Sequence, residues 1–335
     1  MAARFDQAAA SLGSIGNLLL NLPLQCKAQA HEIRLRCGKP VIISLADTNL
    51  FVTQSGAPSY SLRAGLLSAS RRDIDEAFRI ICNSSVHSHQ QEIKNGFVTI
   101  GGGHRAGICG TAISQCGQVL NIRDISSINL RIAREIRGAA DGVLAAVLSG
   151  GSLSGTLLIG PPGCGKTTVL RDLARQLSSG VRGFYRVAVV DERGELAAIS
   201  QGMPQNDLGP CCDVLDGYPK GEGIMQAVRS LSPDIVLCDE IGGEDDARAV
   251  NYSLNAGVAV IASAHAGSIS ELFSRPQLAI LMKSGAFKKA VLLKGRSQPG
   301  RIEQIYGEGE LNDCKGNGDD RDLFGMQCGR ASQIL

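Results

Sequence analysis

The sequence predicts two domains of different fold class, an α+β domain first and an α/β domain with a parallel sheet after it. Length permits this division, because 335 residues are enough for about two ordinary domains. Between residues 32 and 132, short alternating segments typical of strands are mixed with helical patterns. After residue 135 the apolar segments become near-continuous, as in parallel strands that are buried on both faces.

Two segments of the first domain predict helices with identifiable ends. The first 24 residues are rich in Ala, Ser, Gly and Leu and close at Leu22-Pro23, which predicts a short amphipathic helix ended by proline. This helix carries little basic charge, so packing against its own domain is favoured over binding to a membrane surface. Farther along, Ser70 and Asp73 form a capping box ahead of an apolar helical face from Ile74 to Ile81.

The rest of the first domain reads as short strands with one more short helix, over residues 86–94. Strands are expected at residues 33–35, 41–43, 50–52, 97–100, 108–113 and 128–132. A domain with five or more strands and two helices belongs to the α+β class.

In the second domain, helices alternate with buried strands. A helix is expected at residues 139–148, and a flexible break follows it at 149–152. Strands are expected at 156–159, 187–190, 235–238 and 258–262, with helices at 168–177 and 223–231. This alternation predicts a doubly wound α/β fold. The polar composition after Tyr306 predicts a mobile tail, which gives domains at 1–134 and 135–307 and a tail at 308–335.

Composition excludes several classes of protein. Hydrophobic residues make up 44% and charged residues 20%, which argues against a largely disordered chain. Aromatic residues are 4% with no Trp, and the net charge is +2, so no nucleic-acid partner is expected. The eleven cysteines are scattered and lack metal-ligand spacing, and no secretory signal precedes them, so we expect reduced thiols in a cytosolic protein. No apolar run approaches the roughly 20 residues that span a bilayer.

A phosphate-binding motif follows the first expected strand of the second domain. The match to G-x-x-x-x-G-K-[ST] consists of Gly160, Pro161, Pro162, Gly163, Cys164, Gly165, Lys166 and Thr167. Its glycines let the backbone turn N–H groups toward phosphates, Lys166 reaches terminal phosphate oxygens, and the Thr167 hydroxyl holds Mg²⁺. Thr168 then begins the expected helix and completes the predicted nucleotide-binding set. The alternative is a glycine-rich turn before a helix.

The strand at 235–238 ends in two carboxylates. Asp239 would bind Mg²⁺ through water, and Glu240 would act as general base on the attacking water. The alternative is a solvated acidic turn. No N-K-x-D motif supports guanine specificity, so ATP is the default nucleotide.

Two further strand ends carry polar residues that should lie near the phosphate-binding motif. Ligands of open parallel sheets bind beyond the carboxyl ends of the strands, so residues that follow these strands gather at one edge. Residues 191–195 follow one strand, and His265 follows another. Glu192 and Glu195 either take part in catalysis or form an exposed acidic turn. His265 could have a functional role, sensing the γ-phosphate or relaying its loss to the next segment. The alternative is that it is a structural histidine.

These motifs resemble those of the type II/type IV secretion ATPases. Residues 229–241 resemble their Walker B region, 191–195 their aspartate box and 264–266 their histidine box. Segments 32–36, 102–105 and 127–135 further resemble the stage III sporulation protein AA family, over about residues 32 to 306.

The resemblance implies a RecA-like P-loop ATPase that uses ATP and Mg²⁺. It also implies a homo-oligomeric ring, expected to be a hexamer, with ATP between subunits. Such a protein would lie in the mother-cell cytoplasm, held at the membrane through partner proteins that form a secretion-like channel. It would hydrolyse ATP to power or gate that channel during sporulation.

The same resemblance implies a catalytic role for arginines of the first domain. Secretion ATPases place arginines of this domain near the γ-phosphate, where they neutralise transition-state charge. Arg123, Arg131 and Arg134 precede the flexible break, and Arg131 and Arg134 are counted with Glu240, Glu192 and His265 as candidate catalytic residues. The alternative is that these arginines are solvated surface residues.

Two other functions stay open. RecA-like ATPases also drive nucleic-acid motors, and activity stimulated by single-stranded DNA and lost with salt would favour that function. A nucleotide-gated scaffold would instead bind ATP with negligible turnover.

Overall fold

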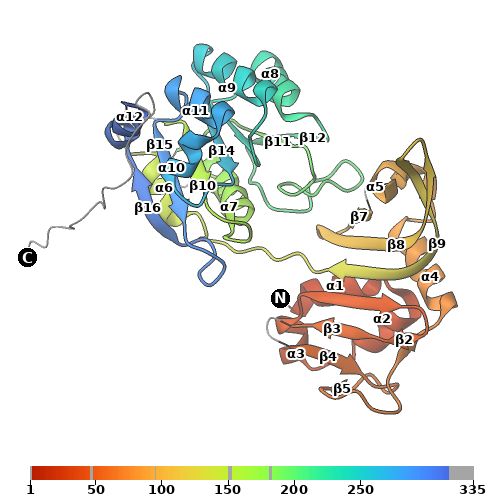
Figure 1. Ribbon diagram of the computed structural model, residues 1–335. Helices are drawn as coiled ribbons and strands as arrows, with labels where there is room; N and C mark the ends of the chain where they lie inside the picture. The colour runs from red at the N-terminus through yellow and green to blue at the C-terminus, as the bar shows by residue number, and fades with distance from the viewer. Residues whose placement is uncertain (1, 46–47, 95, 150–152, 181–182, 317–335) are drawn as a thin grey trace, which may run out of the picture.

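Two seven-stranded sheets organise the computed structural model, which describes residues 2–45, 48–94, 96–149, 153–180 and 183–316 (Figure 1). The first sheet uses strands between residues 32 and 131, and the second uses strands between residues 156 and 306. A long connecting segment leads from one sheet to the other (Figure 1).

The first sheet is antiparallel throughout, in the order β5-β4-β3-β1-β9-β8-β7. Its strands are β1 (Glu32–Arg36), β3 (Ile42–Ser44), β4 (Asn49–Val52), β5 (Pro58–Ser59), β7 (Phe97–Ile100), β8 (His104–Gln115) and β9 (Gln118–Arg131). A small separate pair is formed by β2 (Lys39–Pro40) and β6 (Ser68–Ala69). The strand at 128–132 expected from the sequence is therefore only the end of a much longer β9.

Helices cover this sheet and share one apolar core with it, in which Phe5, Leu19, Ile74 and Leu130 are buried. The helices are α1 (Ala2–Ala10), α2 (Gly13–Leu19), α3 (Leu24–Gln29), α4 (Arg71–Ile81), η1 (Val86–His89) and α5 (Gln90–Lys94). The capping box predicted for α4 is confirmed. The single helix predicted for the first 24 residues is two helices, α1 and α2, because the chain turns at Gly13, the first residue of α2, which has a φ of 60°. The third helix, α3, begins just after the predicted end at Pro23.

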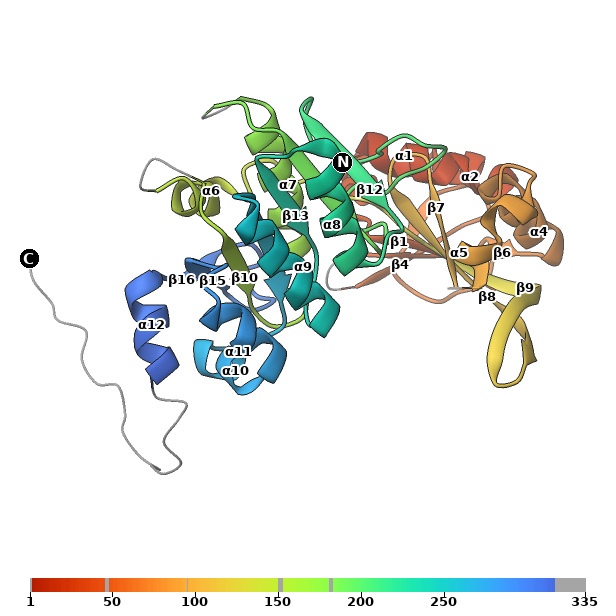
Figure 2. The same cartoon turned by 90° about the horizontal axis from the view of Figure 1, so that it is seen from above.

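The β8–β9 hairpin extends beyond the rest of the sheet, as Figure 2 shows. Near its tip, Ile113, Val119 and Leu120 are exposed. The added length was not predicted, because residues 118–127 alternate too weakly between apolar and polar side chains to indicate a strand.

The second sheet confirms the α/β prediction. Its order is β12-β11-β13-β14-β10-β15-β16, and every neighbouring pair is parallel except β15 with β16. The strands are β10 (Thr156–Ile159), β11 (Val187–Asp191), β12 (Cys212–Asp216), β13 (Ile235–Cys238), β14 (Ala259–Ala264), β15 (Lys289–Leu293) and β16 (Ile302–Tyr306). Four of these strands were predicted; β12, β15 and β16 were not.

Helices lie on both faces of this sheet, as a doubly wound fold requires. They are α6 (Asp141–Val147), α7 (Lys166–Ser178), α8 (Lys220–Leu231), α9 (Glu244–Asn255), α10 (Ile269–Ser274), α11 (Pro276–Lys283) and α12 (Glu308–Gly316). Val143 and Leu173 bury α6 and α7 in one core cluster, while Ile224, Val250 and Leu278 bury α8, α9 and α11 in another.

The segment predicted as a mobile tail begins with α12, in which Leu311 is buried. The rest of that prediction, residues 317–335, lies outside the described residues. Among the helices that the structure describes, none is both long and apolar enough to cross a membrane. The cysteines with described side chains are free.

Candidate active site

The loop from Gly160 to Thr167 connects β10 to α7, and its shape depends on glycine. Gly165 has a φ of 95°, and a Cβ atom there would lie 2.8 Å from the backbone nitrogen of Gly300. At Gly160 a Cβ would lie 2.7 Å from the Cys164 sulfur. Side chains therefore cannot replace these two glycines without displacing the loop.

Lys166 is buried at the start of α7 and reaches back over the loop. Its Nζ donates hydrogen bonds to the carbonyl oxygens of Gly160, at 2.7 Å, and Pro161, at 3.2 Å. The same atom lies 3.1 Å from Nδ1 of His265. The ammonium group thus joins the turned loop to the histidine that follows β14.

Thr167 and Asp239 face each other across the ends of β10 and β13. The Thr167 hydroxyl donates to Oδ2 of Asp239 at 3.1 Å, and the Ser263 hydroxyl donates to Oδ1 at 2.6 Å. Hydroxyl and carboxylate oxygens are the ligands that Mg²⁺ prefers. This donor set fits Mg²⁺ held by Thr167 and, through water, by Asp239.

The backbone of Glu240 is fixed by hydrogen bonds, and its side chain contacts a histidine and an arginine. It has a φ of 31°, a conformation that is strained for a residue other than glycine. Its N–H donates to Asp239 Oδ1, at 2.9 Å, and to the hydroxyl of Ser263, at 3.0 Å. Its Oε1 lies 3.1 Å from Nε2 of His265, and its Oε2 accepts from Arg193 at 3.1 Å.

These contacts determine which nitrogen of His265 carries the proton. The Lys166 ammonium has only donors, so Nδ1 of His265 must accept from it. Nε2 therefore carries the hydrogen and donates it to Glu240. A continuous chain of contacts runs from the phosphate-binding lysine to the candidate base.

The acids at the end of β11 and just after it have different roles: one holds the backbone of the loop, and the others line the site. Asp191 is buried, and its carboxylate accepts from the N–H groups of Glu195, at 2.8 Å, Leu196, at 3.0 Å, and Ala197, at 2.7 Å. Glu192 forms an ion pair with Lys220 at 2.8 Å and lines a small cavity with Asp239 and Glu240. Glu195 lines the same small cavity and also pairs with Arg105 of the first domain at 3.0 Å.

A basic cavity of about 270 Å³ separates the two domains beside α7. Its walls include Thr167, Thr168 and four guanidinium groups, which belong to Arg105, Arg131, Arg134 and Arg171. Among the described residues, the Nε atoms of Arg134 and Arg171 are buried without a hydrogen-bond partner. Buried, unpartnered N–H groups in a cationic cavity fit an anionic ligand.

The two arginines expected to act in catalysis are held differently in that cavity. Arg131 is 68% exposed and lies 3.6 Å from Glu32. Arg134 donates to the carbonyl oxygens of Gln29, at 3.0 Å, and Ala30, at 2.9 Å. Arg131 is therefore the less constrained of the two by contacts. Arg123 pairs with Asp124 at 3.6 Å on the β8–β9 hairpin, and it does not line the cavity.

Sequence reasoning missed several residues of this site. Ser263 carries a usable signal, because it lies two residues before His265 and so on the same side of an apolar strand. Arg171 also carries one, since it lies four residues after Thr167 on the same helix. Arg193 and Arg105 lie in segments 191–195 and 102–105, which were singled out from the sequence without a role for either arginine. Lys220 gives no local signal, because the tertiary fold brings it to the site.

Known proteins resemble this chain in sequence and in fold. Residues 8–311 match the family described as sporulation stage III, protein AA. The stage III sporulation protein AA of Bacillus subtilis (strain 168) is 40% identical over 295 residues, which are 88% of this chain and 92% of that protein.

Two solved structures share the fold. The pilus retraction motor PilT with bound ADP has a TM-score of 0.52 at 15% identity, over 78% of this chain and 74% of that one. The Legionella pneumophila ATPase DotB has a TM-score of 0.50 at 13% identity, over 80% of this chain and 73% of that one. The predicted P-loop ATPase fold is confirmed.

Proposed function

Since the chain belongs to the sporulation stage III protein AA family, we propose that it hydrolyses ATP with Mg²⁺ to power or gate a membrane-channel assembly during sporulation. The observation that carries the proposal is the chain of contacts Lys166–His265–Glu240 beside the Thr167–Asp239 pair. It joins a phosphate-binding cation, a metal-binding pair and a carboxylate base at one sheet edge.

In the proposed mechanism, Lys166 leaves the loop carbonyls and His265 to bind the terminal phosphate. His265 then loses the donor at Nδ1 and is free to turn, which releases Oε1 of Glu240. Glu240 takes a proton from the attacking water. Mg²⁺, when bound, would neutralise charge on the phosphate oxygens. His265 thus reports the occupancy of the phosphate site to the base.

Residues around this centre complete the proposed site. Glu192 keeps Lys220 paired next to the two catalytic acids. Arg131 turns from Glu32 toward the anionic phosphates across the basic cavity, and Arg134 shapes the cavity wall. Such an arginine stabilises transition-state charge.

The wider arrangement is also proposed. We take residues 1–134 as the amino-terminal domain and 135–307 as the ATPase domain. From the resemblance to secretion ATPases we also propose a homo-oligomeric ring, expected to be hexameric, at the cytoplasmic side of channel proteins.

The direct test is the Glu240→Gln variant. It should bind MgATP as the wild type does, while phosphate release falls at least about 100-fold, because the amide cannot accept the proton from water. Glu244→Gln is the matched control: Glu244 is an exposed acid four residues away whose one ion pair among the described residues is with Arg248. Wild-type turnover by Glu240→Gln would refute the assignment of the base.

A further inference from the structure

The loop between β15 and β16 is strongly cationic and lies against the phosphate-binding loop. Residues 294–301 include Lys294, Arg296 and Arg301 and contain no acid. None of these three cations forms an ion pair within the part of the chain that the structure describes. A hydrogen bond from the Lys294 N–H to the Arg301 carbonyl closes the loop at 2.8 Å.

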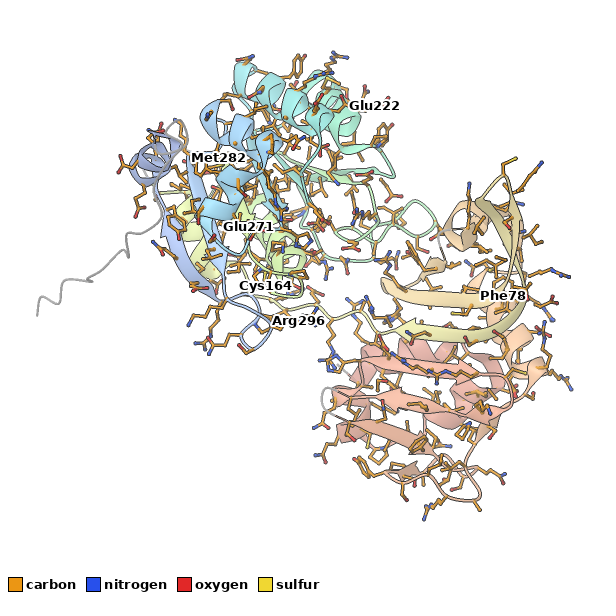
Figure 3. The ribbon with its side chains drawn as sticks, in the orientation of Figure 1. Phe78, Cys164, Glu222, Glu271, Met282 and Arg296 are labelled. Atoms are coloured by element: carbon orange, nitrogen blue, oxygen red, sulfur yellow. The ribbon has the colours of Figure 1, made fainter. Side chains whose placement is uncertain are left out.

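Two hydrogen bonds fasten this loop to residues 160–167. The Gly300 N–H donates to the Cys164 carbonyl at 2.7 Å, and Nε of Arg296 donates to the Pro162 carbonyl at 3.1 Å. The stem of Arg296 lies against Gly163, where an added Cβ would come within 3.2 Å of its Cγ. Figure 3 shows Cys164 and Arg296 at the same end of the domain.

The order of the sheet decides which end of a nucleotide this loop borders. Asp239 and His265 follow β13 and β14, on one side of β10, so the terminal phosphate belongs on that side. The cationic loop follows β15, on the opposite side of β10. It therefore borders the other end of the phosphate chain, where the α-phosphate joins the ribose.

The guanidinium group of Arg296 is suited to bind there. Arg296 is exposed, and only its Nε has a hydrogen-bond partner among the described residues. The two terminal nitrogens can still donate, and a guanidinium presents such donors in a planar fork that matches a phosphate group. Its Nε contact with the loop carbonyl fixes the position from which it donates.

We propose that Arg296 is a nucleotide-binding residue that holds the α-phosphate end of ATP and ADP. This inference rests on the proposed nucleotide site. Because both nucleotides contain the α-phosphate, Arg296 contributes equally to binding each of them and does not affect the chemical step.

The test compares Arg296→Ala with Lys288→Ala, which removes an exposed cation at the opposite end of β15. Calorimetric titration with MgATP, MgADP and magnesium pyrophosphate gives the dissociation constants. For Arg296→Ala, the values for both nucleotides should rise about tenfold, the effect of one charge-assisted hydrogen bond. Pyrophosphate, which lacks the α-phosphate-to-ribose end, should bind as it does to the wild type. Turnover should show a higher KM with an unchanged kcat.

Each remaining outcome is decisive. Unchanged nucleotide affinity in Arg296→Ala overturns the inference, and so does weakened binding of ATP alone. Equal weakening of pyrophosphate would show that Arg296 only supports the loop, and it also overturns the inference. Arg296→Lys, which keeps the charge and loses the fork, should have an intermediate affinity. If the wild type binds no MgATP, the proposed function itself fails.

Discussion

Ser263 fixes both acids of the candidate active site through one buried hydroxyl group. Its Oγ donates to Asp239 and accepts the N–H of Glu240. The N–H of Glu240 donates two hydrogen bonds, which offset the strain of its backbone conformation. A group that orients metal-binding and catalytic carboxylates in this way affects activity without touching substrate.

The Ser263→Ala variant should therefore need more Mg²⁺. We expect the half-saturating Mg²⁺ concentration for ATP turnover to rise about tenfold, since Asp239 loses one of its two side-chain donors. Ser253→Ala is the control, because Ser253 is an equally buried serine that bonds only to the Ala249 carbonyl within α9. A magnesium dependence like that of the control would argue against this role.

His104 should make stability depend on pH. Burial, with a smaller effect of the Arg4 charge, lowers its pKa from 6.5 to about 4. Its Nδ1 accepts the N–H of Ala133 at 3.0 Å, which requires the neutral ring. The unfolded chain therefore binds the proton more readily, so the contribution of His104 is complete above pH 6.5 and is lost as pH falls toward 4.

That loss is about 3 kcal/mol, from 1.36 kcal/mol per pKa unit. Urea unfolding of the wild type between pH 7 and 4 measures it. His104→Asn keeps an acceptor for the Ala133 N–H but cannot titrate, so its stability should fall less over the same range. Parallel curves for the two proteins would mean that His104 does not account for the dependence.

The segment between β11 and β12 links the nucleotide-binding helix to the amino-terminal domain. From α7, Arg171 donates to the Glu195 carbonyl at 2.8 Å, and the Glu195 side chain pairs with Arg105 of β8. Arg105 also lies over the ring of Phe97, 3.8 Å from its centroid. These contacts join α7 to the first sheet.

A double-mutant cycle should detect this link. Arg105→Ala and Glu195→Ala should couple by about 0.5–1 kcal/mol in the free energy of unfolding, because the pair is partly exposed. The cycle cancels the lost contact with Phe97. Glu244 and Arg248 form a control pair, 73% and 75% exposed, for which we expect coupling near zero. If the coupling free energy is equal in both cycles, Arg105 and Glu195 form an ordinary surface ion pair and do not link the two domains.

Helices and strands could be predicted from the sequence where their own residues show a capping motif or an apolar run. The capping box of α4 and the apolar strands β10, β11 and β13 are local signals. β12 and β16 were missed because most of their side chains are exposed or only half-buried, which hides the apolar run expected of a parallel strand. β15 is as buried and apolar as the strands that were predicted, so its own residues carry the signal, and it was overlooked.

In the whole molecule, the two domains face each other across the candidate site. A cavity of about 1020 Å³ has Phe97 and Arg105 on one wall and Glu192 and Arg193 on the other. The smaller basic cavity likewise joins Arg131 to Thr167 within a single chain. The structure therefore favours an arginine that acts on the nucleotide of its own subunit.

Mixing two inactive variants tests this arrangement. Arg131→Ala and Lys166→Ala each disable the proposed site, and their mixture should release phosphate no faster than the two variants measured separately. A clear gain on mixing would place Arg131 at the neighbouring subunit's nucleotide. The mixture must be measured at protein concentrations where the wild type is most active.

Assembly predicts one more property of the whole molecule. Phosphate release per mole of wild-type protein should rise with protein concentration as rings form, because the family resemblance implies that ATP lies at a boundary between subunits, where a neighbour completes a site whose arginine comes from the same chain. Specific activity that is constant over a 100-fold concentration range, with only monomer in sedimentation, would refute the shared site.

Residue types alone predicted phosphate binding by the loop at 160–167 and catalytic roles for the carboxylates after β13 and the histidine after β14. These are short motifs whose function follows from residue type and from the backbone of a strand end. Only the tertiary structure decided that Ser263 orients both acids, that Glu195 faces Arg105, and that the loop at 294–301 covers residues 160–167. The reason is the strand order β13-β14-β10-β15, which places residues distant along the chain side by side, and no local pattern encodes that order.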